Sequence, residues 1–344
     1  MTDIILTVDV EDHFHGVSDI SRRPPYDTIF ARDGGESYGI ERIVRSCKIY
    51  SAEATFFIDV YDHGTVKEGV VQKACEWIHG EGFEVGLHTH PDLDLMCKIR
   101  GNRQKRGMLK SFPLNDQIAF IEKGKERIFR WIGKLPTSHR AGGWYGANYD
   151  TLLAVEQCKI PIDSSMFYRY PTCGLNEPLL TRNAPRLVRT LFELPVTVTQ
   201  TVYQGRWGHL HFPLATFYKK IGLDWCTLSE MKLQMSALQE AKVNPILLFM
   251  HSYSLLDLQN GFKPHLGHIR TFDLLLEWIQ QQKTLRWNTA EGFYKRYRQS
   301  GDTLGSDNVP RVALAVGDLP PDQWKRATQR FLRRPVEMVR WLIP

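Results

Sequence analysis

Ile4-Ile-Leu-Thr-Val-Asp-Val-Glu-Asp-His-Phe-His15 is the stretch from which the rest of the chain can be interpreted. Its apolar, β-branched beginning is typical of a short strand that is buried on both faces of a parallel sheet. The strand ends in three carboxylates, Asp9, Glu11 and Asp12, which two histidines follow. Such a cluster is self-repelling and costly to desolvate, unless a cation or a role in proton transfer compensates it. An acidic turn that faces water is the alternative for this stretch alone.

Length and composition indicate a soluble globular protein. The chain has 344 residues, of which 42% are hydrophobic and 24% charged, and these fractions are ordinary for a globular protein. The amino terminus lacks a basic segment followed by a cleavage site, and no apolar run approaches the roughly 18 residues of a membrane span. The six cysteines are scattered without Cys-x-x-Cys pairs. We therefore expect a cytoplasmic protein with reduced, mostly buried thiols.

The modest net charge of +6 is concentrated in two segments. Residues 98–110 contain six basic and no acidic residues, and residues 325–340 contain six basic residues and one glutamate. Basic segments can attract nucleic acid, anionic lipid or an anionic substrate, although most are simply solvated. Because neither segment belongs to a nucleic-acid-binding motif, we predict no nucleic-acid partner.

Strand-like and helix-like segments alternate seven or eight times along the chain. Helices are expected near residues 40–50, 66–80, 115–132, 148–158, 228–242, 271–282 and 290–298. Further strands are expected near residues 54–59, 83–87, 139–140, 160–162, 191–198, 245–250 and 284–287. This alternation predicts an α/β fold with a mostly parallel sheet or barrel. The pattern is hardest to read between residues 168 and 226, where five prolines lie among aromatic residues and glycines.

Polar residues that bind metals or move protons recur where the expected strands end. They are Asp9, Glu11, Asp12, His88, His90, Asp92, Arg140, Asp163 and His251. Any one of them alone would more often be a helix cap or a surface residue. The carboxyl ends of the strands in an α/β sheet or barrel converge, however, and ligands bind there. Their shared position therefore predicts a catalytic or metal site.

Five motifs in this order resemble the polysaccharide deacetylase family, the NodB-homology domains of carbohydrate esterase family 4. The motifs are Leu6-Thr-Val-Asp-Val-Glu-Asp-His13, Gly86-Leu-His-Thr-His-Pro91, Arg140-Ala-Gly-Gly-Trp-Tyr-Gly146, Asp163 after a strand, and Leu247-Leu-Phe-Met-His251. The resemblance implies a distorted (β/α)7-type barrel over residues 1–300. Residues 301–344 would then form a basic, amphipathic C-terminal helical tail, which either docks on the barrel or contacts an anionic membrane.

The resemblance also implies one divalent metal, with zinc as the expected ion. We assign its ligands to Asp12, His88 and His90. Two departures from the family pattern leave Glu11 and Asp92 as alternative ligands. The first motif is an Asp-x-Glu-Asp variant of the usual adjacent Asp pair, and the histidines of the second motif lie two rather than four positions apart. Three ligands of this type leave a coordination position open, as catalytic zinc requires.

The catalytic roles follow from the same resemblance. It makes Asp9 the base that activates water, Arg140 the residue that orients this base, His251 the general acid, and Asp163 the residue that holds His251. A carboxylate and an imidazole form a chemically sensible base and acid pair. The glycine-rich turn after Arg140 is expected to bind the substrate, with backbone N–H groups near Gly143, Trp144 and Tyr145.

The predicted function is the metal-dependent removal of an acetyl group from an N-acetylated sugar. The substrate would be a sugar or a nucleotide- or lipid-linked glycan intermediate of surface polysaccharide synthesis. Two alternatives remain open at this point. One is a catalytically silent sugar-binding module, and the other is an amidohydrolase of a small cyclic amide on the same scaffold. The location predicted for the chain is the cytoplasm, at the inner face of the membrane if the tail contacts lipid.

Overall fold

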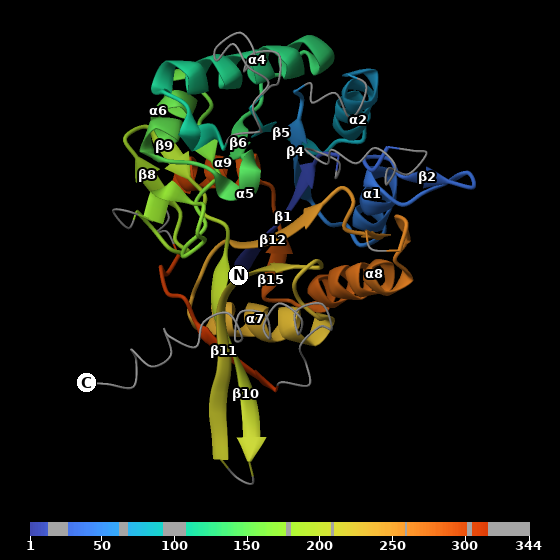
Figure 1. The fold of residues 1–344 in the computed structure, drawn as a ribbon, viewed down its shortest axis with the longest axis vertical. Helices are drawn as coiled ribbons and strands as arrows, with labels where there is room; N and C mark the ends of the chain where they lie inside the picture. The colour runs from blue at the N-terminus through green and yellow to red at the C-terminus, as the bar shows by residue number, and fades with distance from the viewer. Residues whose placement is uncertain are drawn as a thin grey trace.

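The computed structural model describes residues 1–12, 27–61, 68–91, 108–176, 180–207, 210–258, 260–300 and 305–315. At its centre, β1 (Thr2–Val10) lies between β4 (Ala54–Asp59) and β12 (Ile246–His251) and pairs in parallel with both. Figure 1 shows this sheet in the middle of the molecule, with helices around it. The stretch that opens the sequence is thus the central strand of the fold.

The predicted parallel sheet is observed on both sides of β1. Beyond β4 it continues in parallel through β5 (Glu84–Thr89), β6 (Ser138–Ala141), β7 (Ile162–Asp163) and β9 (Leu191–Glu193). The strand β8 (Arg186–Val188) is antiparallel to β9, and β15 (Leu285–Trp287) pairs with the beginning of β1. Two small ladders lie apart from this sheet, β2 (Arg32–Asp33) with β3 (Glu36–Ser37) and β13 (Leu256–Asp257) with β14 (Lys263–Pro264).

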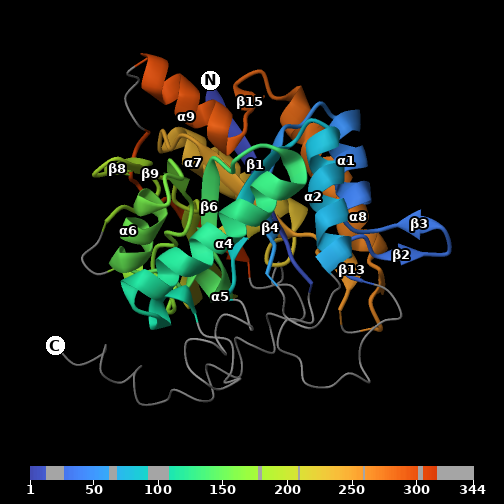
Figure 2. The ribbon, with the colours of Figure 1, turned by 90° about the horizontal axis from the view of Figure 1, so that it is seen from above.

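Helices fill the connections between the parallel strands, and Figure 2 shows them around the central strands. They are α1 (Ile40–Ile49), α2 (Glu68–Gly80), α4 (Leu114–Ile132), α5 (Gly142–Tyr145), α6 (Tyr149–Gln157), α7 (Leu228–Glu240), α8 (Leu266–Gln281) and α9 (Ala290–Ser300). Two short 3-10 turns lie at Leu109–Ser111 and Gly174–Asn176. The helix α6 begins with a capping box between Asn148 and Thr151, and α4 ends at Gly133 in the left-handed conformation.

The strand β1 is buried on both faces, as its sequence predicts. Ile4 belongs to the main hydrophobic core, whereas Ile5 packs into a second cluster on the opposite face, with Phe192 and Phe293. Burial of an isoleucine side chain contributes about 1.5–3 kcal/mol. The hydroxyl of Thr7 donates to the carbonyl of Leu248 at 2.9 Å, so this polar side chain is satisfied inside the sheet. The core thereby fixes the position of the acidic residues that follow the strand.

A long hairpin projects from the body of the molecule (Figure 1). Its strands are β10 (Val198–Trp207) and β11 (Leu210–Gly222), and only the end of β11 pairs with β12. We predicted a strand over residues 191–198 and none over the rest of this region. The prediction missed the hairpin because Pro213 interrupts the strand pattern at an irregularity, where the register shifts between Tyr203 and Gln204.

Residues 305–315 follow α9 along the chain and return to the sheet. Within them β16 (Arg311–Ala315) pairs in parallel with β10, so the first described part of the expected tail is a strand. The basic amphipathic segment that we expected to be helical lies in residues 316–344, outside the described residues. In the described part of the chain, no helix has the length and apolar character needed to cross a bilayer. The five described cysteines are buried free thiols, as expected.

Candidate functional site

The register of the sheet brings the polar strand ends together. Asp9 on β1 is level with His251 on β12, and His88 on β5 is level with Arg140 on β6. Because β4 lies between β1 and β5, these four residues occupy one end of neighbouring strands. The convergence that we predicted for Asp9, His88, Arg140 and His251 is therefore present in the structure.

Glu11, His88 and His90 form a group that can hold a metal ion. One ligand atom from each lies within 4.8 Å of the others. The Glu11 Oε2 atom is 2.7 Å from His90 Nε2 and 3.6 Å from His88 Nε2. In addition, His88 Nδ1 is 3.0 Å from the carbonyl oxygen of Arg140, which can only accept a hydrogen bond. The proton of His88 is thus assigned to Nδ1, and the lone pair on Nε2 faces the group.

This donor set fits the divalent metal that we predicted. Two imidazole nitrogens and one carboxylate oxygen are typical ligands of a catalytic zinc ion. His88 is 3% exposed, and the carbonyl bond to Nδ1 is the kind of support that metal-binding histidines usually have. His90 is held from the other side by Gly142, where any Cβ atom would collide with the His90 ring. The site is therefore compatible with a three-ligand metal centre.

The carboxylate in this group is Glu11 and not Asp12, which we had assigned as the ligand. The Oδ1 atom of Asp12 instead accepts a hydrogen bond from the Thr28 hydroxyl at 2.5 Å. The reason is the alternation of side chains along an extended chain, which places Asp9 and Glu11 on one face and Asp12 on the other. Asp92, the other alternative ligand, lies outside the described residues.

Asp9 is held beside this group by a buried arginine. Arg140 Nη1 donates to Asp9 Oδ1 at 2.7 Å and to the Thr7 hydroxyl at 3.1 Å. The other carboxylate oxygen of Asp9 is 3.8 Å from His88 Nε2. Burial favours the neutral acid, but the charge of Arg140 outweighs it and holds the pKa of Asp9 below its ordinary value. Asp9 is thus ionised, and its Oδ2 atom faces the group that Glu11, His88 and His90 form.

Arg140 itself is fixed on all sides. Its guanidinium is fully buried and also donates to the carbonyl and hydroxyl of Ser164. The Arg140 Cζ atom lies 4.2 Å from the centre of the Phe57 ring. A buried arginine needs such partners, because an unpaired charge in the interior is strongly destabilising. The geometry therefore matches the orienting position expected for Arg140.

His251 completes the site on the other side of Glu11. Its Nε2 atom is 3.7 Å from Glu11 Oε1, and its ring stacks on Tyr253 with 4.7 Å between centroids. On the far side of the ring, Nδ1 is 3.1 Å from Asp224 Oδ2, which also accepts a hydrogen bond from Ser254 at 2.9 Å. The residue that holds His251 is therefore Asp224.

Asp163, which we expected in that role, lies elsewhere. It is fully buried and accepts a 2.6 Å hydrogen bond from His139 Nδ1, on the neighbouring strand. His139 in turn is 3.0 Å from the Thr89 hydroxyl. This chain of contacts runs between β7, β6 and β5. The structure differs from our assignment because Asp163 is the last residue of β7, beyond β6 in the sheet, whereas Asp224 lies two residues after β11, the direct neighbour of β12.

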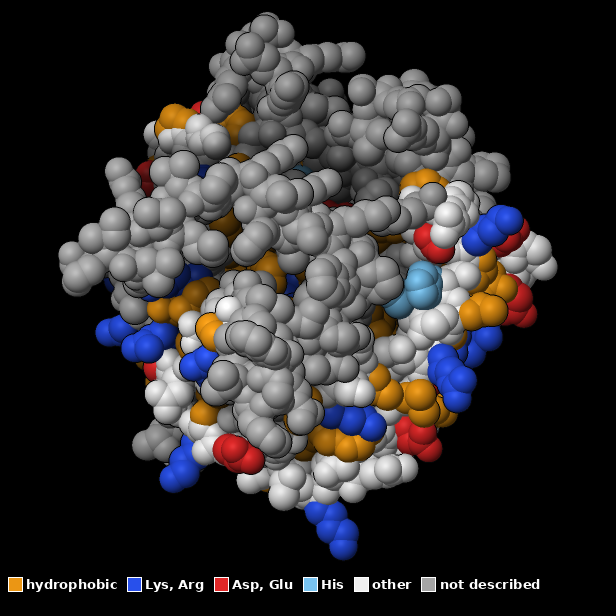
Figure 3. All heavy atoms as spheres, turned by 60° about the horizontal axis from the view of Figure 1, so that its bottom comes forward, with side chains coloured by type: hydrophobic (Ala, Val, Ile, Leu, Met, Phe, Trp, Pro, Cys, Tyr) orange, Lys and Arg blue, Asp and Glu red, His pale blue; other side chains and the backbone are white. Residues whose placement is uncertain are grey.

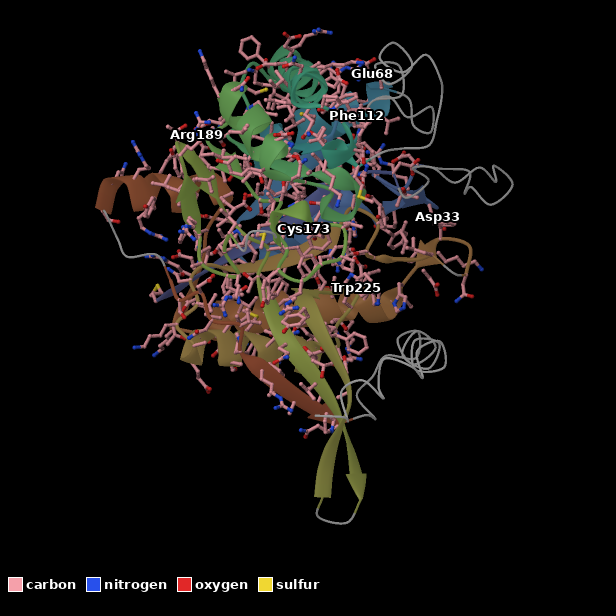
Figure 4. The ribbon with its side chains drawn as sticks, turned by 60° about the vertical axis from the view of Figure 1, so that its left-hand side comes forward. Asp33, Glu68, Phe112, Cys173, Arg189 and Trp225 are labelled. Carbon is pink, nitrogen blue, oxygen red and sulfur yellow. The ribbon has the colours of Figure 1, made fainter. Side chains whose placement is uncertain are left out.

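The sequence did carry a signal for Asp224 that we missed. Asp224 and Trp225 come two and three residues after the strand β11, and the other site residues likewise lie at the carboxyl ends of their strands. Because the hairpin was not recognised, the end of its second strand was not recognised either. Figure 4 labels Trp225 near the base of the hairpin.

The turn after Arg140 has the close backbone approach that its glycines predict. Residues 142–145 form the single helical turn α5, in which Gly143 has a φ of +64° and Tyr145 a φ of +60°. The Tyr145 side chain is buried and packs edge-on against Phe167, 5.0 Å away. Trp144, the third residue that we expected to bind substrate, has a side chain outside the described part. The turn thus borders the metal group, because Gly142 touches His90.

The chain is similar to known proteins in its three-dimensional structure. No family model matches the sequence, and no curated protein matches it. A Mycobacterium smegmatis protein assigned to the polysaccharide deacetylases aligns over 91% of this chain and 96% of its own, with 14% identity and a TM-score of 0.55. PuuE allantoinase aligns over 88% of this chain and 93% of its own, with 11% identity and a TM-score of 0.53.

A third solved structure is similar to the same extent. It is a Pseudomonas aeruginosa PAO1 protein, also assigned to the polysaccharide deacetylases, which aligns over 88% of this chain and 93% of its own, with 11% identity and a TM-score of 0.51. At such low identity these similarities concern the fold alone. They confirm the α/β fold of NodB-like type that the sequence predicts.

Proposed function

We propose that the chain is a metal-dependent hydrolase that removes the acetyl group from an N-acetylated sugar or glycan intermediate. The observation that carries this proposal is the arrangement around Glu11. Its carboxylate lies with His88 and His90 on one side and within 3.7 Å of His251 on the other. The ionised carboxylate of Asp9 is next to the same group. An ordered base, a metal-type donor set and an imidazole acid are the parts that amide hydrolysis requires.

The metal would be held by Glu11, His88 and His90. When bound, a divalent cation there polarises the acetyl carbonyl and lowers the pKa of water. Asp9 takes a proton from the attacking water as the new C–O bond forms to the acetyl carbon. Arg140 keeps the carboxylate of Asp9 oriented and ionised during this transfer.

The second proton transfer completes the reaction. His251 delivers a proton to the amine nitrogen as the C–N bond breaks, so acetate and the free amino sugar leave. Asp224 holds His251 through Nδ1, which leaves Nε2 on the side of the site. Backbone N–H groups of the turn at residues 142–146 are suited to hold the acetyl oxygen, because this turn touches His90.

Acetate release from a panel of N-acetylated sugars, with zinc restored to metal-free protein, tests this function. We expect release only in the presence of metal. The panel includes a small cyclic amide, because PuuE allantoinase has a similar fold. Ring opening without acetate release would favour the amidohydrolase alternative. Binding of sugars with no turnover at any metal concentration would favour a silent sugar-binding module.

Replacing Asp224 with Asn should lower kcat by roughly 10²-fold, because an amide does not hold the acid in the right orientation and charge state. Substrates with poor leaving groups should suffer most, since these need the amine protonated as it departs. The comparison is Asp163→Asn, which removes a buried carboxylate that does not contact His251. An equal leaving-group dependence in both variants would contradict the pairing of His251 with Asp224.

The basic tail is proposed to bind an anionic membrane surface, where a lipid-linked substrate would be found. Residues 325–340 contain six basic residues among apolar ones, and such segments attract anionic lipid. The full chain should cosediment with vesicles that contain anionic lipid, and less so at high salt. A chain truncated after Ala315 keeps β16 and should lose this binding. Equal sedimentation of both chains would contradict the proposal.

Nucleic acid is not proposed as a partner. In Figure 3 the described Lys and Arg side chains lie at separate places around the visible face. Neither basic segment of the sequence, residues 98–110 or residues 325–340, belongs to a recognisable nucleic-acid-binding motif.

A further inference from the structure

Lys220 is a buried lysine beside the site that the proposed mechanism does not use. Its side chain lies near the end of β11, and the residue is 7% exposed. Its Nζ atom donates to the Tyr145 hydroxyl at 2.9 Å and lies 3.0 Å from the centre of the Phe249 ring. The neighbouring Lys219 bonds to Glu230 instead, 2.8 Å away. Of these two adjacent lysines, Lys220 is the one whose ammonium group contacts the site.

Both contacts of Lys220 lead to residues of the proposed mechanism. Phe249 meets the ring of His251 edge-on, with 4.9 Å between centroids, and lies 5.4 Å from the guanidinium of Arg140. Tyr145 closes the turn that follows Arg140 on the chain. The ammonium group therefore bridges the strand that carries His251 and the turn that borders His90.

The turn needs such a support because its backbone is strained. Tyr145 has a φ of +60°, in the left-handed region that a bulky residue seldom adopts. Conformations of this kind cost about 1–3 kcal/mol and persist when the surroundings hold them in place. The Tyr145 hydroxyl is buried in this position and receives its hydrogen bond from Lys220. Loss of that hydrogen bond would remove a contact that links Tyr145 to the strand β11.

The turn has little freedom to move without disturbing the site. Gly142 lies against the His90 ring, and Gly146 lies against Met108 so closely that a Cβ atom would clash at either glycine. A displacement at Tyr145 would thus be transmitted to His90 through the turn.

The position of the lysine is also costly to maintain. Loss of hydration on burial lowers the pKa of Lys220 to about 7, although the nearby carboxylates of Asp9 and Asp224 oppose this shift. A methionine would fill the same space without this cost. The contacts of the amine therefore explain its presence here better than packing does.

We propose that Lys220 is a positioning residue. From its place over the Phe249 ring, its Nζ atom donates a hydrogen bond to the Tyr145 hydroxyl and so fixes the turn at residues 142–146 against His90. Its catalytic consequence rests on the proposed function, but the positioning itself does not. Loosening the turn should lower kcat with little change in KM, because the turn is expected to act on the acetyl oxygen as charge develops there.

The first test measures the turn directly by amide hydrogen exchange of a peptide that covers residues 142–147. Lys220→Met and Tyr145→Phe should both increase its exchange rate, since each removes the same hydrogen bond. The matched control is Lys219→Met, which removes a buried lysine that bonds to Tyr203 and Glu230 on the other side of the strand. Unchanged exchange in both Lys220→Met and Tyr145→Phe overturns the proposal. If Lys220→Met fails to fold, Tyr145→Phe alone decides.

The second test is a double-mutant cycle on the deacetylation of the best sugar substrate. Each single variant should lower kcat by roughly 10-fold with KM unchanged, and the double variant should lose no more than either single one. Additive losses, or an equal loss of kcat in Lys219→Met, overturn the proposal. If the parent protein deacetylates nothing while hydrogen exchange still responds as expected, the proposed function fails and the positioning role stands.

Discussion

Asp9→Asn is expected to lower kcat/KM for deacetylation by roughly 10²- to 10⁴-fold, the usual contribution of a general base. The amide has nearly the same shape as the carboxylate but cannot take a proton from water. The metal content should stay at the parent level, because Asp9 is not among the three ligand residues. Acetate release and bound zinc, measured on the same preparation, check both halves of this expectation.

The pH dependence of the parent protein gives an independent check. Because the charge of Arg140 holds the pKa of Asp9 below its ordinary value of 3.8, the base is ionised throughout the neutral range and is lost only in acid. Protonation of Asp9 should therefore not limit kcat/KM near neutral pH. Near-normal turnover in Asp9→Asn, on a substrate that the parent deacetylates, would show that another group activates the water.

The general location of the site was predictable because the fold has a simple rule. Chemistry-bearing residues follow strands, and the carboxyl ends of parallel strands meet. The strands that carry Asp9, His88 and His251 are short, apolar and buried, which is the pattern that sequence reveals best. The type of these strands and their order along the chain were thus sufficient to predict that these three residues lie close together.

The contacts within the site were less predictable, since they depend on geometry that the motifs do not contain. The choice between Glu11 and Asp12 depends on how far the extended conformation of β1 continues past its last residue. The partner of His251 depends on which strand lies beside β12, and that strand belongs to a hairpin with an irregular register. Pairing between distant segments decides both questions, and local sequence carries little of that information.

Glu11→Gln and His88→Ala are each expected to weaken zinc binding by at least roughly 100-fold, more than the usual effect of removing a residue that only supports a ligand. Each variant removes a ligand atom of the group that Glu11, His88 and His90 form. Zinc retained after dialysis and affinity from competition with a chelator give the measurement. Thermal unfolding of the metal-free proteins shows whether the variants remain folded.

Asp12→Asn is the matched control for Glu11→Gln, because the two acids are adjacent and the structure assigns them different roles. Asp12 accepts the Thr28 hydroxyl, and the amide oxygen of Asn can still accept it, so the variant should lose at most about 1 kcal/mol of stability and keep its zinc affinity unchanged. Asp9→Asn should behave like the parent in the same assay. Zinc lost from Asp12→Asn and retained by Glu11→Gln would return the ligand role to Asp12. It would also mean that the chain turns after Val10 differently once the metal is bound.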